Sequence, residues 1–448
     1  MQKRNLLIII LFLFTGTIGW SAERIRQNFD FDWQFRLGEQ GIYKPVQLPH
    51  DWSIELDFNE EVGPESGYLP GGIGYYKKDF NVPASYKGKR VSIVFDGIYH
   101  KATIYLNGQE VDYHRYGYTS FETDLTPYLK YGGKNTLSVK VDHSEKSRWY
   151  TGSGIYRHVW MQVTNPIHVK MWGTYITTPR VSAESAIVSC VTTVANTSAL
   201  TGEIEIMQRI VDAQGNLLKI NGKQYAARTE VVMPENGTKD IAQSFTLSNP
   251  QLWNLEKPYL YRLETILKQK GKVIDRYTTR FGVRTIGFDK DKGFFLNGKN
   301  IKMKGACLHQ DAGCLGVAVP NRSYERRLTI LKEFGANAIR CSHNPPSPEF
   351  LNYCDSIGFL VVDEAFDKWK SGYYEQFFDE CWQQDIRDMI VRDRNHPSIV
   401  LWSIGNELAE ATRKDNVGVE RATLLRDFVH KLEPTRPCLL YTSPSPRD

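Results

Sequence analysis

Apolar strands alternate with helices in the C-terminal third of the chain, and this alternation limits the fold more than any other feature. The helix that follows the first of these strands carries its apolar side chains, from Tyr324 to Phe334, on one face. Near-continuous apolar strands between helices indicate a parallel sheet that is buried on both faces. The predicted strands cover residues 301–309, 338–343, 359–364 and 398–402.

These four strand–helix units predict that residues 287–437 are the first half of a (β/α)₈ barrel, since a whole barrel takes about 250 residues. An open, doubly wound sheet of four strands is the alternative. Such sheets carry a Gly-rich phosphate loop after the first strand, whereas residues 306–309 read ACLH. The barrel is therefore the preferred interpretation.

The first two thirds of the chain predict two β-sandwich domains. Residues 23–165 contain short alternating strands with Gly and Pro turns, and Asn107-Gly108 is a strong hairpin signal. This pattern indicates a jelly roll or a related sandwich. Residues 166–286 have the size and strand spacing of an immunoglobulin-like sandwich.

The two ends of the chain differ from the rest. Residues 1–22 combine Lys3 and Arg4 with a short apolar core and then small residues, which predicts a secretory signal peptide and hence export to the periplasm or the medium. The apolar core is too short for a comfortable membrane span, and no later segment is long and apolar enough. Residues 438–448 contain a Ser-Pro repeat, and we expect them to be a non-native tail on a truncated chain.

Charge and cysteine content exclude several classes of function. The 56 Lys and Arg residues against 51 Asp and Glu residues give a net charge of +5 without a basic run, which argues against nucleic acid as the partner. The seven cysteines are odd in number and scattered, so they predict no disulfide framework. The sequence leaves open whether the chain forms homo-oligomers.

Polar side chains follow the predicted strands of the C-terminal region, at the rim where barrel active sites lie. The strands end with Arg340 and His343, with Asp363 and Glu364, and with Asn406 and Glu407; the first ends at residues 309–311, which include His309 and Asp311. Such a polar rim costs desolvation energy and is hard to explain as packing.

Glu407 is the sharpest catalytic candidate on this rim. A carboxyl buried beside Trp402 would favour its neutral form, as a general acid near neutral pH requires. Helix capping or an ion pair with an arginine is the structural alternative. Arg340 would hold a catalytic carboxylate ionised, or else form a structural salt bridge.

Three further patterns are weaker. Cys307 with His309, and Cys341 with His343, raise the hypothesis of a zinc site, but their spacing matches no familiar zinc motif. Ser153 lies in no G-x-S-x-G elbow, which disfavours a serine mechanism. The loop 148–157, rich in aromatic residues, Gly and Arg, is either an ordinary turn or a segment that reaches the barrel mouth.

Two long motifs resemble the signatures of glycoside hydrolase family 2. The first is NAIRCSHNP at 337–345 followed by GFLVVDE at 358–364, and the second is DRNHPSIVLWSIGNE at 393–407. Shorter matches extend the resemblance over about residues 28–437: PHDW at 49–52, GSGIYR at 152–157 and RFGVR at 280–284. The resemblance implies a jelly roll, an immunoglobulin-like domain and a catalytic barrel.

The resemblance also implies roles for individual residues. Glu407 would be the general acid/base, Asn406 would bind the substrate 2-hydroxyl, and Arg340 and His343 would lie in the sugar subsite. The segments 304–311, with His309 and Asp311, and 363–369, with Trp369 as a stacking platform, are similar to exported β-galactosidases of the family. The family's nucleophile, a glutamate on a later strand, would lie beyond the chain, so this chain alone is expected to be inactive.

The resulting prediction is an exported, retaining β-galactosidase that is truncated within its barrel and needs no cofactor. Some family members hold magnesium through a Glu-x-His pair, but residues 367–369 read DKW here, so we predict no metal. The alternatives are a β-glucuronidase or β-galacturonidase of the same family, a non-catalytic carbohydrate-binding protein, and a structural surface protein. The predicted partner is a β-galactoside, with neither nucleic acid nor a membrane span.

Overall fold

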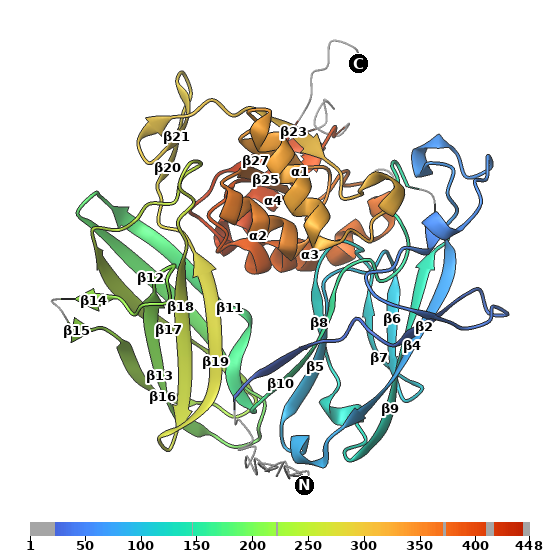
Figure 1. Cartoon of the computed structure of the whole chain (residues 1–448), viewed down its shortest axis with the longest axis horizontal. Coiled ribbons are helices and arrows are strands. Elements are labelled where there is room, and N and C mark those ends of the chain that lie inside the picture. Colours follow the sequence, from blue (N-terminus) through green and yellow to red (C-terminus); the bar gives the residue numbers. More distant parts are fainter. Residues whose placement is uncertain (1–22, 146, 221–222, 371–372, 409–415, 442–448) are drawn as a thin grey trace, which may run out of the picture.

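The chain folds into two β-sandwiches that both contact a C-terminal domain of strands and helices (Figure 1). The computed structural model describes residues 23–145, 147–220, 223–370, 373–408 and 416–441. The predicted signal peptide lies outside these residues. Within them, no helix combines the length and the apolar character needed to cross a bilayer.

The first sandwich packs a four-stranded sheet, in the order β1-β10-β5-β8, on a six-stranded sheet, in the order β3-β2-β4-β9-β6-β7. Asn107 and Gly108 join β6 to β7 with φ angles of 53° and 85°, the left-handed pair that a tight hairpin turn requires. The strands are β1 (Ile25–Asn28), β2 (Trp33–Leu37), β3 (Lys44–Val46), β4 (Gly72–Val82), β5 (Arg90–Phe95), β6 (Ala102–Leu106), β7 (Gln109–His114), β8 (Phe121–Asp124), β9 (Gly133–His143) and β10 (Val159–Thr164).

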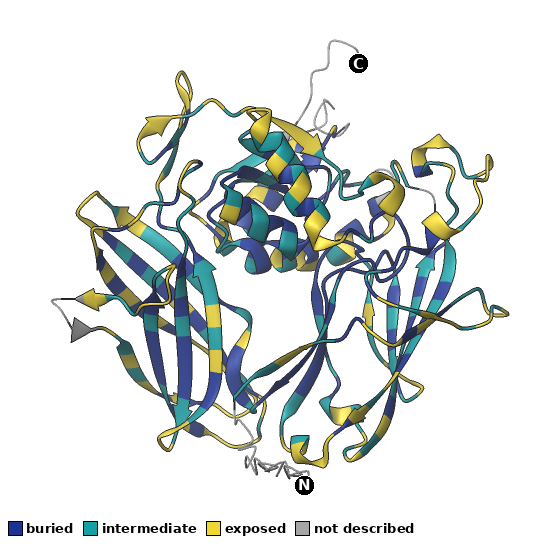
Figure 2. Ribbon diagram, in the orientation of Figure 1, coloured by how far each residue is buried: buried dark blue, intermediate teal, exposed yellow. Residues whose placement is uncertain are grey.

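The second sandwich packs the sheet β11-β12-β17 on the sheet β16-β13-β18-β19. Buried and outward-facing residues alternate along many strands of both sandwiches, as expected for sheets with one face in a core (Figure 2). The strands of these sheets are β11 (Ile167–Val181), β12 (Ser185–Asn196), β13 (Gly202–Val211), β16 (Ala227–Met233), β17 (Gly237–Ser248), β18 (Tyr261–Gln269) and β19 (Lys272–Phe281). β14 (Lys219–Ile220) and β15 (Lys223–Gln224) form a separate sheet of two strands.

A small antiparallel sheet precedes the C-terminal domain. The domain itself contains a sheet of five parallel strands, which lie side by side in chain order. The small sheet contains β20 (Ile286–Asp289), β21 (Gly293–Leu296) and β22 (Lys299–Asn300). The parallel strands are β23 (Gly305–Leu308), β24 (Ala338–Cys341), β25 (Leu360–Glu364), β26 (Ile399–Asn406) and β27 (Cys438–Tyr441). The helices are α1 (Asn321–Glu333), α2 (Pro348–Ile357), α3 (Phe378–Asp393) and α4 (Val417–Leu432).

The strand–helix alternation is therefore confirmed, and α2 shows how locally it is encoded. The hydroxyl of Ser347 accepts a hydrogen bond from the Phe350 amide at the start of the helix, and Pro348 occupies the first turn. Gly358 ends the helix with a φ of 85°, in the left-handed region that glycine adopts without strain.

Three details differ from the sequence prediction. Residues 438–441, expected to belong to a tail, form the fifth strand β27 beside β26, while residues 442–448 lie outside the described part. The first strand is shorter than predicted and mostly exposed, because β23 is an edge strand whose one partner among the described strands is β24. Phe334 ends α1 as its C-cap with 87% of its surface exposed, since the chain leaves the helix there.

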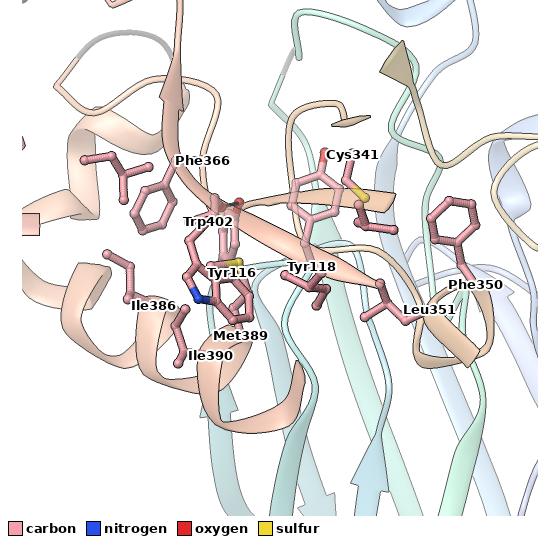
Figure 3. Packing of buried hydrophobic residues seen from close by; sticks show 14 of the residues in the cluster. Tyr116, Tyr118, Cys341, Phe350, Leu351, Phe366, Ile386, Met389, Ile390 and Trp402 are labelled. Atoms are coloured by element: carbon pink, nitrogen blue, oxygen red, sulfur yellow. Dashed lines mark hydrogen bonds between the residues drawn. The ribbon is translucent and has the colours of Figure 1, made fainter. Parts of the chain in front are cut away.

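The N-terminal sandwich and the C-terminal domain share one hydrophobic core. Tyr116 and Tyr118, from the sandwich, pack with Cys341 and Trp402 of the parallel sheet and with Met389 of α3 (Figure 3). The Tyr116 hydroxyl also donates a 2.6 Å hydrogen bond to the carbonyl of Ala365, directly after β25. The sandwich is thus fixed beneath the strand ends rather than tethered by a linker.

Candidate active site

The carboxyl ends of β24, β25 and β26 bring together the polar residues that the sequence predicted. Register pairs Arg340 with Val362 across β24 and β25, and Glu364 with Ser403 across β25 and β26. Because the strands are parallel and adjacent, their ends meet at one edge of the sheet. Arg340, His343, Asn406 and Glu407 therefore belong to one cluster with Glu364.

Glu364 is the centre of this cluster and has no solvent-exposed side-chain surface. Arg340 donates to it with Nε and Nη2, at 2.9 and 3.0 Å. His343 Nδ1 lies 2.7 Å from Oε1, and the Ser403 hydroxyl donates to Oε2 at 2.7 Å. Both carboxylate oxygens are thus occupied, so Glu364 acts as a structural anchor that orients Arg340 and His343.

Asn406 lies between two partners that fix its amide. Its Oδ1 accepts a hydrogen bond from Arg340 Nη2 at 2.9 Å, and its Nδ2 donates to Asp367 Oδ1 at 2.9 Å. The backbone N–H of Asn406 also donates to the backbone carbonyl of Asp367 at 2.7 Å. A side-chain amide makes up to four hydrogen bonds, so one N–H and one lone pair remain for a ligand.

Glu407 lies at the solvent edge of the cluster, and the predicted burial beside Trp402 is wrong. About half of its side chain is exposed (49%), whereas Trp402 lies in the core and donates to Glu433. The hydrogen bond from Arg148 Nη2, at 3.1 Å, is the main cause that lowers the pKa of Glu407, and Lys368 adds to it. In this arrangement Glu407 is ionised, the form of a base rather than of an acid.

The backbone of Glu407 is also unusual. Its φ of 44° lies in the left-handed region, which residues other than glycine rarely adopt without compensation. Lys368 supplies that compensation, since its ammonium donates to the carbonyls of Asn406 and Glu407 at 2.8 and 2.6 Å. Strained backbone held by neighbouring contacts is a feature of functional sites.

Trp369 does not offer a surface to a sugar, contrary to the prediction from sequence. Its ring is fully buried, and Nε1 donates to the Ile404 carbonyl at 2.6 Å. The sequence places Trp369 two residues after Asp367 but cannot tell which way the ring turns. Here it turns inward beneath β26.

Trp149 is the aromatic side chain that lies at the rim instead. Its ring centroid lies 5.2 Å from that of His309 and 5.6 Å from that of His343. Burial lowers the pKa of His309, and the neighbouring His343 adds to this, so His309 is neutral at pH 7. Asp311 lies beside this group but makes a local contact, since its carboxylate accepts from the Gly313 amide.

The loop 148–157 contacts the C-terminal domain, as expected if it is a segment that reaches the barrel mouth rather than an ordinary turn. Arg148 donates to Asp367 at 2.9 and 2.6 Å in addition to Glu407. At the other end of the loop, Arg157 donates to the Pro345 carbonyl at 2.8 Å. Ser153 is buried against His143 and Ser53, so its hydroxyl is structural.

Sequence reasoning missed the roles of Arg148, Asp367, Lys368 and Trp149, although it singled out the segments that carry them. The signal was present in the polar run after β25 and in the Arg-Trp pair of the loop. The described residues contain no group of three or more His, Cys, Asp or Glu side chains placed to hold a metal ion. Cys341 is buried and His343 contacts Glu364, so the described geometry does not support the zinc hypothesis.

Comparison with known proteins agrees with this architecture. Three family models match in succession: "Glycosyl hydrolases family 2, sugar binding domain" at residues 30–166, "Glycosyl hydrolases family 2" at 167–284 and "Glycosyl hydrolases family 2, TIM barrel domain" at 289–443. Beta-galactosidase BoGH2A of Bacteroides ovatus is 44% identical over 436 residues, which is 92% of this chain and 50% of that protein.

Other relatives carry a different activity in their names. A beta-glucuronidase of Bacteroides fragilis is 30% identical over 95% of this chain and 62% of its own length. The crystal structure of a glycosyl hydrolase family 2 member from Bacteroides cellulosilyticus superposes with a TM-score of 0.88 at 39% identity, over 94% of this chain and 56% of that one. The chain thus spans about half the length of such relatives. The matched domains, the shared fold and these identities together show that the chain belongs to glycosyl hydrolase family 2.

Proposed function

We propose that this chain carries the acid/base side of a retaining β-glycosidase active site. The observation that supports the proposal is the meeting of Arg340, His343, Asn406 and Glu407 around the buried Glu364 at one strand-end rim. A carboxylate next to fixed amide and imidazole groups suits the cleavage of a glycosidic bond. The substrate class is therefore a carbohydrate.

Glu407 is the general acid/base in this proposal. In the first step it gives a proton to the glycosidic oxygen while the bond between that oxygen and C1 breaks; in the second it takes a proton from water. Since Arg148 keeps Glu407 ionised, the sugar has to displace the Arg148 guanidinium before Glu407 can hold its proton. Asn406 binds the 2-hydroxyl with its free N–H, and Trp149 replaces Trp369 as the apolar contact for the ring.

The nucleophile is a second carboxylate, which a retaining mechanism places about 5–5.5 Å from the first. Glu364 does not serve, because its oxygens accept four hydrogen bonds and the side chain is closed to solvent. We place the nucleophile on a strand encoded beyond residue 448, and the greater length of the relatives supports this. Sequencing the source DNA past that codon tests the placement.

The sugar is a terminal β-D-galactosyl residue in our proposal, and a β-glucuronide is the alternative. The 44% identity to a named beta-galactosidase supports the first. The alternative draws on the relatives named beta-glucuronidases and on the two cations at the rim, Arg148 and Lys368, which could face a sugar carboxylate.

Azide rescue tests the function on the 448-residue chain itself. Azide replaces the missing nucleophile: it attacks C1 of a 4-nitrophenyl β-galactoside, the bond from C1 to the phenolic oxygen breaks, and the α-galactosyl azide forms. Phenyl β-galactoside needs protonation of its leaving group, whereas 2,4-dinitrophenyl β-galactoside does not. We therefore expect Glu407→Gln to abolish azide-dependent cleavage of the phenyl substrate and to spare that of the dinitrophenyl substrate.

The outcomes separate the alternatives. Azide-dependent cleavage of glucuronides but not galactosides would reassign the sugar. Hydrolysis without azide would mean that a carboxylate of this chain is the nucleophile. Galactose binding without azide-dependent cleavage would leave a carbohydrate-binding protein and overturn the catalytic proposal.

Export is the second part of the proposal, and it rests on residues 1–22. Expression of the chain with its leader should yield a secreted product whose N-terminus begins close to Ala22. Full-length protein retained in the cytoplasm would contradict it. Replacing Leu7 and Ile9 by arginine should abolish export without touching the folded domains.

A further inference from the structure

A cavity of about 340 Å³ lies where the immunoglobulin-like sandwich meets the C-terminal domain, far from the strand-end rim. It lies between β11, the residues that follow β19, the turn after α3 and the residues that follow α4. Arg284 and Arg436 on its wall both donate to the carbonyl of Ile399, the first residue of β26. Asn406, the last residue of that strand, is about 23 Å away at 3.3 Å per residue.

Three arginines line this cavity, and no carboxylate does so among the described lining residues. Within the described residues, the Arg284 guanidinium donates to two backbone carbonyls, those of Pro397 and Ile399, both at 2.6 Å. Burial, followed by the charge of Arg436, lowers the pKa of Arg284 to about 9. The charges of Glu433 and Asp355 act in the opposite direction, but among the described residues neither forms an ion pair with Arg284, and a buried guanidinium without a paired anion is poorly stabilised.

Arg394 is the least satisfied of the three. Its Nε is buried and has no hydrogen-bond partner in the described part of the molecule, and Nη2 reaches only the Trp172 carbonyl at 3.5 Å. The guanidinium carbon of Arg394 lies 4.7 Å from the centre of the Tyr175 ring. This contact orients the guanidinium group but does not neutralise its charge. An unfilled donor at a buried position such as that of Nε is costly unless an acceptor binds there.

The carboxylates whose charges act on these arginines are already engaged. Glu433 pairs with Arg436 at 3.2 Å and accepts hydrogen bonds from Tyr175, Trp402 and Thr435. Asp355 lies 2.6 Å from His396 Nδ1 and accepts from the Ser398 amide, so in the described part of the molecule neither carboxylate pairs with Arg284 or Arg394. In a neighbouring cavity, three of the five lining arginines, Arg24, Arg276 and Arg392, each pair with a carboxylate.

We infer that this cavity binds an oxyanion, either a free inorganic ion such as sulfate or the anionic group of a sugar. Planar guanidinium groups bind such oxygens in pairs, and the cavity leaves room for a sugar ring beyond the anion. Because the walls come from two domains, the bound anion would also hold the sandwich against the C-terminal domain. The inference does not depend on the proposed glycosidase activity.

Calorimetric titration of the whole chain with sodium sulfate and with D-galactose 6-sulfate, at an ionic strength kept constant with sodium chloride, tests the inference. Wild type should bind with a saturable heat, and Arg394→Gln should bind at least tenfold more weakly. Arg228→Gln is the control, since it removes an arginine that does not line the cavity and that pairs with Glu205 at 3.3 Å; its affinity should stay within twofold of wild type. Sulfate should also slow amide exchange at residues 394–396.

A galactose 6-sulfate affinity at least tenfold above that of sulfate would assign the site to an anionic sugar, and equal affinities would assign it to the free ion. Arg394→Lys serves if the glutamine variant does not fold: it keeps the charge but loses the fork, so it should still weaken binding. No saturable binding by wild type would overturn the inference, as would equal binding by the Arg394 variants and the control.

Discussion

Replacing Arg340 by methionine should weaken the strand-end rim at its centre. Arg340 gives Glu364 two hydrogen bonds between charged groups, and Glu364 is fully buried while 13% of the Arg340 side chain is exposed. Breaking a buried ion pair by removing one partner costs about 3–5 kcal/mol. We expect about 3 kcal/mol, at the lower end of the range, because His343 and Ser403 still donate to Glu364 and water can reach the vacated position.

Hydrogen exchange measured by mass spectrometry on peptides from β24 to β26 reports this loss without requiring two-state unfolding of a multidomain chain. A change of about 3 kcal/mol corresponds to roughly 150-fold faster exchange. Arg326→Met, at an exposed position on α1, is the matched control and should change the opening free energy by less than about 0.5 kcal/mol.

The double variant Arg340→Met, Glu364→Gln decides whether the uncompensated charge is the cause. With both charges gone, the cost should fall to about 1 kcal/mol or less. The reasoning is refuted if Arg340→Met exchanges within threefold of wild type, or if the double variant exchanges faster than the single one.

Three further predictions concern titrating groups. Burial alone would raise the pKa of Glu433, but Arg436 lowers it to about 2. This stabilisation is complete above pH 4.5 and fades toward pH 2, so Glu433→Gln should cost about 3 kcal/mol at pH 7 and little near pH 2, by exchange in β26 and β27. Burial lowers the pKa of His158, yet its Asp30 partner raises it to about 9. The stabilisation is complete below pH 6.5 and lost as the pH rises through 9, so the melting temperature of His158→Asn should approach that of wild type at pH 9.5. Arg148→Gln should raise the pKa of Glu407 and move the pH optimum of azide-dependent phenyl galactoside cleavage upward.

The rim could be predicted from the sequence because the order and direction of the strands determine it. Parallel strands in chain order place their carboxyl ends together, so Arg340, His343 and Asn406 could be expected to meet before any contact was known. The same logic says nothing of side-chain direction. It could not tell that the Trp369 ring turns into the core or that Glu407 turns outward.

The surroundings of Glu407 could not be predicted from the neighbouring sequence, for another reason. Arg148, its hydrogen-bond partner, lies 259 residues earlier in another domain. No periodicity joins positions so far apart, and only the docking of the sandwich brings them together. The expectation of a neutral, buried acid failed because it considered the neighbours in sequence alone.

The shared core between the first sandwich and the C-terminal domain has a consequence for synthesis. The Tyr116 hydroxyl and its acceptor at Ala365 are 249 residues apart. At about 5–20 residues per second, the ribosome needs roughly 12–50 s to make that interval. For that time the sandwich has left the exit tunnel with the tyrosine face uncovered, so a chaperone that shields aromatic surface should crosslink to nascent chains halted near residue 300 and release them once translation has passed Trp402.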